Sequence, residues 1–342
     1  MNLNTLWDLI DRPLAYHSRE GVQFTVGVGV TLPGSSALQV AEDWRADRCV
    51  RDPNLLRNLQ HSCQALLEQC SLSTTIKLDY DSVAQAPYPR VAHLMNDEEE
   101  VKGFLGRHWL QGVEIIVKEV LRQKGVEGSF DFVRGSHGHQ IPDWLAKHRN
   151  QTRCIVEGKS ETVMNAHYKN LLERADNDTE IVWAETSAGT NTANLLYKVA
   201  IYLGTYKRTW LCLTSLSCML VFRLVRRSGG RPYLVVSDPV YVPDHAERFT
   251  VMTDGRCGRD WIPTMVATCL CEIASDEPGL SFTVSPSPVP TGAPTPPPEC
   301  PTVYPGYDSS SETETSHSDN SSDGTYLSSS SLVCRQLFFI VS

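Results

Sequence analysis

Three charged residues in the middle of the chain have types and spacing suited to phosphodiester chemistry. Asp143 opens one short apolar segment. Glu157 and Lys159 lie at the end of a second apolar segment, Arg153–Lys159, which follows a turn-like polar stretch at Lys147–Thr152. If both segments are strands, the two carboxylates can meet on one face of a sheet. Residues two apart in a strand point the same way, so Glu157 and Lys159 share that face.

Two carboxylates beside an ammonium form the set that holds a hard divalent cation and activates water next to a phosphate. In this interpretation Asp143 and Glu157 bind Mg²⁺ or Mn²⁺. Lys159 positions or polarises the attacking water and offsets transition-state charge. A further carboxylate would complete the ligand set, and the acidic residues of the preceding segment supply the candidates, Glu100 first and Glu114 as its competitor. The alternative interpretation is an exposed hairpin with ordinary surface charges.

The flanking sequence predicts helices and strands in a definite order. Asp97–Lys124 is expected as one long amphipathic helix, because its apolar residues recur at three- and four-residue steps. Ser129–Arg134 has strand composition, and the two segments that carry the charged residues follow it as strands. After a long polar connection, Asn194–Tyr206 is expected as a helix, with strands at Trp210–Thr214 and Cys218–Arg226. The order is therefore helix, three-stranded meander, helix and strand.

This order, with Asp143 followed by the triplet Glu157-Gly158-Lys159, resembles the PD-(D/E)XK nuclease superfamily. Over about residues 90–275 it is similar to the nuclease-like region that precedes the kinase domain in fungal-type protein kinases. The resemblance implies an α/β (α+β) fold with a restriction-endonuclease-like core, in which helices flank a central mixed sheet. It also implies a magnesium-dependent hydrolase that acts on nucleic acid, with Asp143, Glu157 and Lys159 as catalytic residues.

Two positions depart from the superfamily pattern. The middle residue of the triplet is usually bulky and apolar, whereas here it is Gly158, which weakens a strand interior and packs against nothing. The helix after the triplet often carries a glutamine and an aromatic residue one turn later, and Lys198 and Tyr202 occupy that spacing. These departures leave open a function of another class, a catalytically inactive binding or regulatory module of a fungal-type kinase-associated protein.

The net charge of −9 is unevenly distributed. Eight acidic residues and one basic residue follow Ser275, so the first 275 residues carry 32 acidic and 30 basic groups. This near-neutral balance excludes a strongly basic nucleic-acid binder. A local cluster of Lys147, Arg149 and Arg153 beside the motif could still contact phosphates, or could be ordinary solvated strand ends.

The sequence predicts three regions. Residues 1–90 are expected as an extension that packs on the core, with a strand at Val22–Val30 and a helix at Asn54–Cys70. The nuclease-like domain spans residues 91–275, which leaves residues 276–342 as a tail.

Two further elements are expected near the end of the nuclease-like domain, a strand at Tyr233–Val242 and a closing helix at Asp260–Ile273. The tail from Asp276 is rich in Pro, Ser and acidic residues and is expected to be disordered. It could be phosphorylated, and it is the candidate contact for a kinase or another protein.

Cysteine usage and hydropathy predict an intracellular protein without a membrane span. The eleven cysteines are scattered without a C-x-x-C pair, which favours buried reduced thiols over metal sites or disulfides. His137-x-His139 has no cysteine or carboxylate partner nearby in its Gly-rich turn. The longest apolar run, Trp210–Val225, is interrupted by polar residues and is short for a membrane-spanning helix. The N-terminus lacks a charged-then-apolar signal pattern.

Overall fold

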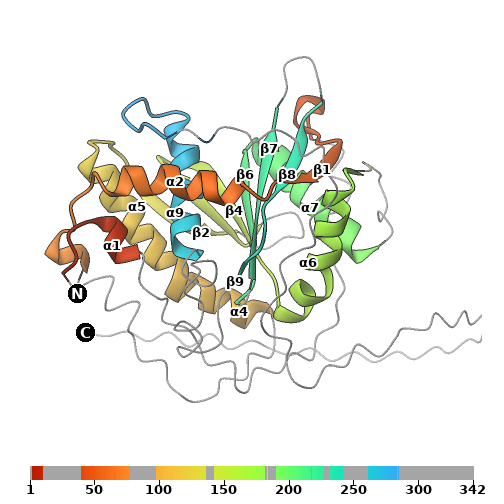
Figure 1. Cartoon of the computed structure of the whole chain (residues 1–342), viewed down its shortest axis with the longest axis horizontal. Coiled ribbons are helices and arrows are strands. Elements are labelled where there is room, and N and C mark those ends of the chain that lie inside the picture. The colour runs from red at the N-terminus through yellow and green to blue at the C-terminus, as the bar shows by residue number, and fades with distance from the viewer. Residues whose placement is uncertain are drawn as a thin grey trace, which may run out of the picture. The chain divides into compact units, whose positions relative to one another are not determined.

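A computed structural model describes residues 2–10, 40–77, 98–135, 142–181, 183, 190–216, 218–226, 231–241, 261–282 and 284 (Figure 1). Three features expected from the sequence lie outside these residues: the strand at Val22–Val30, the His137-x-His139 pair and the part of the tail beyond Val284. None of the helices in the described ranges is long and apolar enough to cross a membrane.

Helices and strands are mixed along the described part of the chain. In chain order they are α1 (Leu6–Ile10), the 3₁₀ turn η2 (Glu42–Trp44), β1 (Arg48–Arg51), α2 (Leu55–Leu67), α4 (Glu98–Phe104), the π-helical segment η3 (Leu105–Leu110), α5 (Gln111–Gln123), β2 (Phe130–Arg134), β3 (Trp144–His148), β4 (Gln151–Gly158), α6 (Glu161–Asp176), β5 (Thr179–Glu180), α7 (Asn191–Tyr206), β6 (Trp210–Thr214), β7 (Cys218–Val225), β8 (Tyr233–Val236), β9 (Val240–Tyr241) and α9 (Trp261–Ala274).

Within the described residues these strands form one nine-stranded sheet. Its order is β2-β3-β4-β6-β7-β8-β1-β5, and β9 pairs with β7. β4 runs parallel to β6, and β1 runs parallel to β8. The other pairs are antiparallel. The sheet is therefore mixed, as the sequence predicts.

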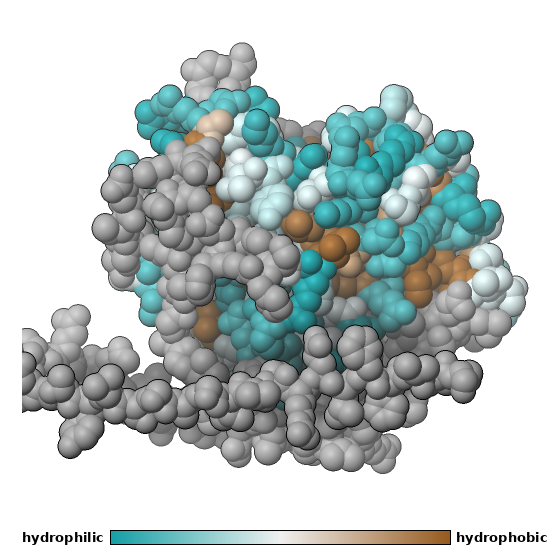
Figure 2. Space-filling view, turned by 180° about the vertical axis from the view of Figure 1, so that it is seen from behind, coloured by the Kyte–Doolittle hydropathy of each residue, from teal (hydrophilic) through white to brown (hydrophobic). Residues whose placement is uncertain are grey.

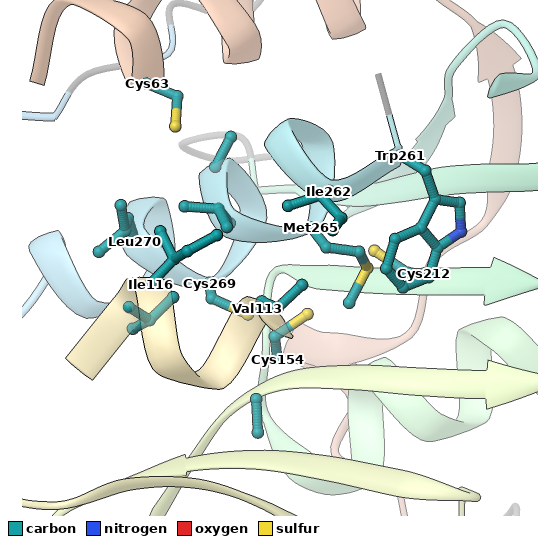
Figure 3. Packing of buried hydrophobic residues seen from close by; sticks show 14 of the residues in the cluster. Cys63, Val113, Ile116, Cys154, Cys212, Trp261, Ile262, Met265, Cys269 and Leu270 are labelled. Carbon is teal, nitrogen blue, oxygen red and sulfur yellow. The ribbon is translucent and has the colours of Figure 1, made fainter. Parts of the chain in front are cut away.

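Helices cover both faces of the sheet (Figure 1). One apolar cluster joins α1, α2, α4, α5 and α9 to the first face, and a second joins α6 and α7 to the other. Figure 3 shows the first layer, in which Cys154 of β4, Cys212 of β6 and Cys269 of α9 pack near Val113 and Met265. The expected mixed α/β fold with flanking helices is confirmed.

The cysteines in the described part of the chain are free thiols. All of them are buried except Cys271, which is half-buried. At these positions the prediction of buried reduced thiols is confirmed. A cysteine behaves as a small apolar side chain, which packs well between the strands and the helices.

The expected long helix is present, but it is not α-helical throughout. α4, the π-helical segment η3 and α5 follow one another without a break. Gly106 lies in η3, where an added Cβ atom would stand 2.7 Å from Cη2 of Trp144 at the start of β3. The helix therefore approaches β3 closely because residue 106 has no side chain. α5 ends before Gly125, whose φ of 67° suits a glycine at a helix end.

The polar connection expected between Lys159 and Asn194 is a wrong prediction, because it contains α6. Ser160 caps this helix by accepting a hydrogen bond from the Val163 N–H at 3.3 Å. The buried side of the helix carries apolar residues at helical spacing: Val163, Met164, Tyr168, Leu171, Leu172 and Ala175. The predicted helix at Asn194–Tyr206 is confirmed as α7, which starts at Asn191.

The N-terminal region belongs to the sheet and is more than an extension packed on it. β1 lies between β8 and β5, where it pairs with both. The expected helix at Asn54–Cys70 is confirmed as α2. The single strand expected at Tyr233–Val242 is two strands, β8 and β9.

The expected boundary at Asp276 needs correction, because the folded part continues beyond it. Leu280 and Val284 are buried in the first apolar cluster. Asp276 and Glu277 form ion pairs with Arg153 and Arg149 of the β3–β4 hairpin. The closing helix itself is as expected, since α9 spans Trp261–Ala274.

Candidate functional site

Asp143, Glu157 and Lys159 converge where β3 begins and β4 ends. Trp144 pairs with Val156, so the residues beside them, Asp143 and Glu157, lie opposite one another. Asp143 Oδ2 accepts a hydrogen bond from the Gly158 N–H at 2.8 Å, and the Asp143 N–H donates to Glu157 Oε2 at 3.3 Å. Asp143 lies just before the strand, and its side chain turns toward the end of β4.

Two ammonium groups share one oxygen of Glu157. Lys159 Nζ lies 2.6 Å from Glu157 Oε1, and Lys198 Nζ of α7 lies 2.8 Å from the same atom. Lys159 also contacts Glu98 Oε1 of α4 at 3.1 Å. Glu157 and Lys159 are 3% and 5% exposed, so this pairing takes place almost entirely out of water.

Lys102 of α4 forms the other half of the site. Its Nζ atom lies 2.8 Å from Asp143 Oδ1, 3.0 Å from Glu98 Oε1 and 3.1 Å from Glu99 Oε1. Lys102 and Asp143 are nearly buried, whereas Glu99 is exposed. Lys102 therefore bridges the carboxylates of the helix to the first acidic residue of the motif.

We call this group of six residues the charge cluster: Glu98, Lys102, Asp143, Glu157, Lys159 and Lys198. It contains three carboxylates and three ammonium groups, so its formal charge balances. Glu99, which also contacts Lys102, is left out because its side chain is exposed to water. Balanced charge is what a buried ionic group requires, because an unpaired charge away from water is strongly destabilising.

The surroundings move the pKa values of the two acidic anchors in opposite directions. Burial alone would raise the pKa of Glu157, but the Lys159 and Lys198 ammonium groups lower it to about 2. Burial and then the charge of Glu157 raise the pKa of Asp143 to about 6, against the influence of Lys159 and Lys102. Glu157 is therefore the permanent anion of the pair, and Asp143 is the group that titrates.

The acid that the long helix contributes to the cluster is Glu98. Glu100, the candidate from the sequence, is exposed on α4. Glu114 contacts Lys118 and accepts a hydrogen bond from the Phe132 N–H of β2. Glu98 could have been found from helical spacing, because it stands four residues before Lys102 on the side of the helix that carries Val101 and Leu105.

Lys198 and Tyr202, which occupy the spacing of the superfamily's glutamine and aromatic residue, lie on α7. This helix reaches the site, although α6 lies between it and β4 in the chain. Lys198 contacts Glu157 and lies 5.6 Å from the centroid of the Tyr202 ring. Lys102 is the member of the cluster that the motif does not indicate. Its position depends on Gly158, because an added Cβ atom at Gly158 would stand 3.3 Å from Cγ of Lys102.

The anchors as arranged do not fit a divalent cation. Each carboxylate oxygen of Asp143 and Glu157 already accepts from an ammonium group or a backbone N–H. Mg²⁺ needs near-octahedral oxygen ligands, and it would have to compete with these donors, the ammonium groups above all, for the same oxygens. In the described part of the chain no group of three or more His, Cys, Asp or Glu residues is arranged to hold a metal ion. Magnesium therefore stays a prediction from the resemblance.

The basic cluster beside the motif is largely engaged within the protein. Arg149 and Arg153 pair with Glu277 and Asp276, respectively. Among the residues coloured by hydropathy in Figure 2, hydrophilic ones predominate, with several hydrophobic patches between them. Among the large hydrophobic residues with a described side chain, Val133 is the exposed one. The arginines of the hairpin thus hold the segment after α9 in place.

Comparisons of the chain with protein families, with curated proteins and with solved structures found no match. The functional interpretation therefore rests on the sheet topology and on the charge cluster.

Proposed function

We propose that the chain is a nuclease-like module that binds a protein partner and does not hydrolyse phosphodiesters. The topology supports a restriction-endonuclease-like core. A helix leads into the meander β2-β3-β4, two helices follow, and β6 then joins β4 in parallel. The resemblance to the nuclease-like region of fungal-type kinases implies the same order with one helix before β6, and α6 is an additional helix in this chain.

The proposal rests on one observation, which is that ammonium groups already contact the carboxylate oxygens of the site. Three ammonium groups neutralise three carboxylates in the charge cluster. Breaking a buried ion pair by removing one partner costs about 3–5 kcal/mol. A cation that entered this site would have to displace Lys102 from Asp143 and a lysine from Glu157. The charge cluster therefore links α4, β4 and α7 through ion pairs and stabilises their packing.

The engagement of three arginines, two of them in the motif hairpin, favours a protein partner over nucleic acid. Arg149 and Arg153 are paired, and Arg223 donates to the backbone oxygen of Val284. Affinity for nucleic acid depends on basic groups that are available to replace counterions at phosphates. The resemblance names the class of partner, a kinase of the fungal type.

Cleavage assays on single- and double-stranded DNA and RNA, with Mg²⁺ or Mn²⁺, test the absence of hydrolysis. Wild-type protein and Lys159→Ala are expected to give the same background level. Metal-dependent cleavage by the wild type that the Lys159→Ala variant lacks would overturn the proposal.

The partner is tested separately, by titrating a purified fungal-type kinase domain into the full-length labelled protein. Saturable binding supports the assignment. A flat titration up to high micromolar concentration removes this kinase class as the partner.

The convergence of Asp143, Glu157 and Lys159 favours a second candidate function, a metal-dependent phosphodiesterase. In that function Lys159→Ala abolishes cleavage and leaves metal binding largely intact, because an ammonium is not a metal ligand. Asp143→Ala and Glu157→Ala lose both. The same cleavage assays, combined with metal-binding measurements on these variants, distinguish the two functions.

A further inference from the structure

Lys102 is surrounded by carboxylate oxygens as a bound cation would be. Oxygens of Glu98, Glu99 and Asp143 lie within 3.1 Å of its Nζ atom. They come from two separate parts of the chain, the first turn of α4 and the residue before β3. The side chain of Lys102 is only 12% exposed, so the ammonium is an internal part of the site.

The room for Lys102 comes from the glycine in the acidic triplet. A Cβ atom at Gly158 would lie 3.3 Å from Lys102 Cγ and 3.6 Å from Leu105 Cδ1. The first distance is tighter than an ordinary van der Waals contact, so a bulky side chain at position 158 would displace the lysine stem. The position of Lys102 is therefore tied to the absence of a side chain at Gly158.

We infer that the Lys102 ammonium replaces a divalent cation in this site, and that removing its charge opens a binding site for Mg²⁺ or Mn²⁺. Removing Lys102 frees Asp143 Oδ1 of its ammonium partner, while Glu98 Oε1 keeps its contact with Lys159 at 3.1 Å. The ligands of the opened site are Asp143 and Glu98. This inference rests on the proposed function and explains how the site is held without a metal ion.

The replacement has a chemical consequence. An ammonium offsets the charge of carboxylates, as a cation does, but it offers no coordination position to water. It therefore cannot lower the pKa of a bound water molecule in the way a metal ion does. Lys102 preserves the electrostatic balance of the site and removes its means of activating a nucleophile.

The test uses the full-length protein with Lys102→Met, which keeps a long apolar stem, and Lys102→Gln as a second variant. Cooperative thermal unfolding is checked first in EDTA. MgCl₂ or MnCl₂ is then titrated against NaCl of equal ionic strength. We expect either variant to gain about 5 °C or more in Tm at one hundred times Kd, and calorimetry to give one site. The wild type should not respond.

A matched control lies on the same long helix. Lys118 contacts Glu114 at 2.7 Å and Asp131 at 3.1 Å, but its side chain is 45% exposed. Lys118→Met should gain no metal response, because its carboxylates are not held together out of water. Adding Asp143→Asn to Lys102→Met should abolish the gained response.

The outcomes separate this inference from the proposed function. A folded Lys102 variant that ignores both metals overturns the inference, as does a Lys118→Met variant with an equal gain. Neither result affects the proposed absence of hydrolysis. Metal binding by the wild type, accompanied by cleavage, overturns both. Metal-free cleavage by the wild type overturns the proposed function, while a metal response confined to the Lys102 variants still supports the inference.

Discussion

Lys198 Nζ on α7 lies 2.8 Å from Glu157 Oε1 on β4, and it is the second ammonium on that oxygen after Lys159. Lys198→Met removes one of these two partners. We expect a loss of about 1–3 kcal/mol in unfolding free energy, below the ~3–5 kcal/mol for a buried charge left without a partner. Lys198→Gln should lose less, because its amide can still donate. Urea unfolding at pH 7 measures both.

The control for this pair is Glu42→Ala. Glu42 lies 3.8 Å from Arg231 in an exposed ion pair, and its loss should leave stability unchanged. If Lys198→Met is as stable as the Glu42→Ala control, the contact with Glu157 contributes nothing.

Two glycines on the long helix should respond to alanine in opposite directions. A Cβ atom at Gly106 would lie 2.7 Å from the Trp144 ring, so Gly106→Ala should destabilise the protein by about 1–3 kcal/mol. At Gly103 the nearest contact is Arg107 Nη2 at 3.7 Å, so Gly103→Ala should stabilise it by about 0.5–1 kcal/mol. Chemical unfolding of both variants checks the signs. Destabilisation of equal size at both positions would exclude close packing against Trp144 as the cause.

Asp143 should make the protein lose stability as pH rises from about 4 to about 6. Its pKa is raised to about 6 by burial and by Glu157, so between these values the folded state binds more protons than the unfolded state. Stability therefore falls with rising pH in this window, by on the order of 2 kcal/mol. Asp143→Asn should remove the fall. Glu157 acts at lower pH and with opposite sign, because its pKa is lowered to about 2.

Urea unfolding of wild type and Asp143→Asn at several pH values, in EDTA, measures this difference. Parallel profiles from pH 4 to 7 would mean that Asp143 titrates normally in the folded state.

A chain that ends at Ser275 should be less stable than one that ends at Ser287. The shorter chain lacks Leu280 and Val284, which are buried in the first apolar cluster. Burying such side chains contributes about 1.5–3 kcal/mol each, which corresponds to a drop in Tm of about 5 °C or more. The chain that ends at Ser287 should melt like the full-length protein, because the remaining residues are mostly polar and proline. Equal melting of the two shortened chains would restore the boundary at Asp276.

Alternation was enough to place Glu157 and Lys159 together, because the period of a strand fixes which side chains share a face. Lys159 follows the last residue of β4, and its N–H still donates to Thr214 of β6. A turn was also predicted before β4, over Lys147–Thr152, and the structure confines it to Arg149 and Asn150, between β3 and β4. Arg149 and Asn150 both have positive φ, and such a turn reverses two strands within two residues. Lys198 was indicated only by the resemblance, which places it where the superfamily often has a glutamine. The contribution of Lys102 was not indicated by any pattern, because helix packing and the space beside Gly158 bring it to the carboxylates.

β1 shows why a short strand can escape prediction. Its sequence, Arg48-Cys-Val-Arg51, begins and ends with a charged residue and resembles a surface loop. Arg51 is nonetheless buried, since Asp176 and Asp238 pair with its guanidinium from α6 and from the segment after β8. Asp176 and Asp238, which neutralise the buried Arg51, are distant from it in the chain, so a local sequence pattern cannot indicate this strand.

The position of β1 also imposes an order of events during synthesis. Cys49 pairs with Leu234 on one side and with Thr179 on the other, so β1 can take its place only after β8 has left the ribosome. Pairings of such long sequence separation form slowly, and a nascent chain folds from its N-terminus. Until then Val50, buried in the finished protein, has no sheet to join. We therefore expect the apolar residues of β1 to stay exposed on the growing chain until β8 has emerged.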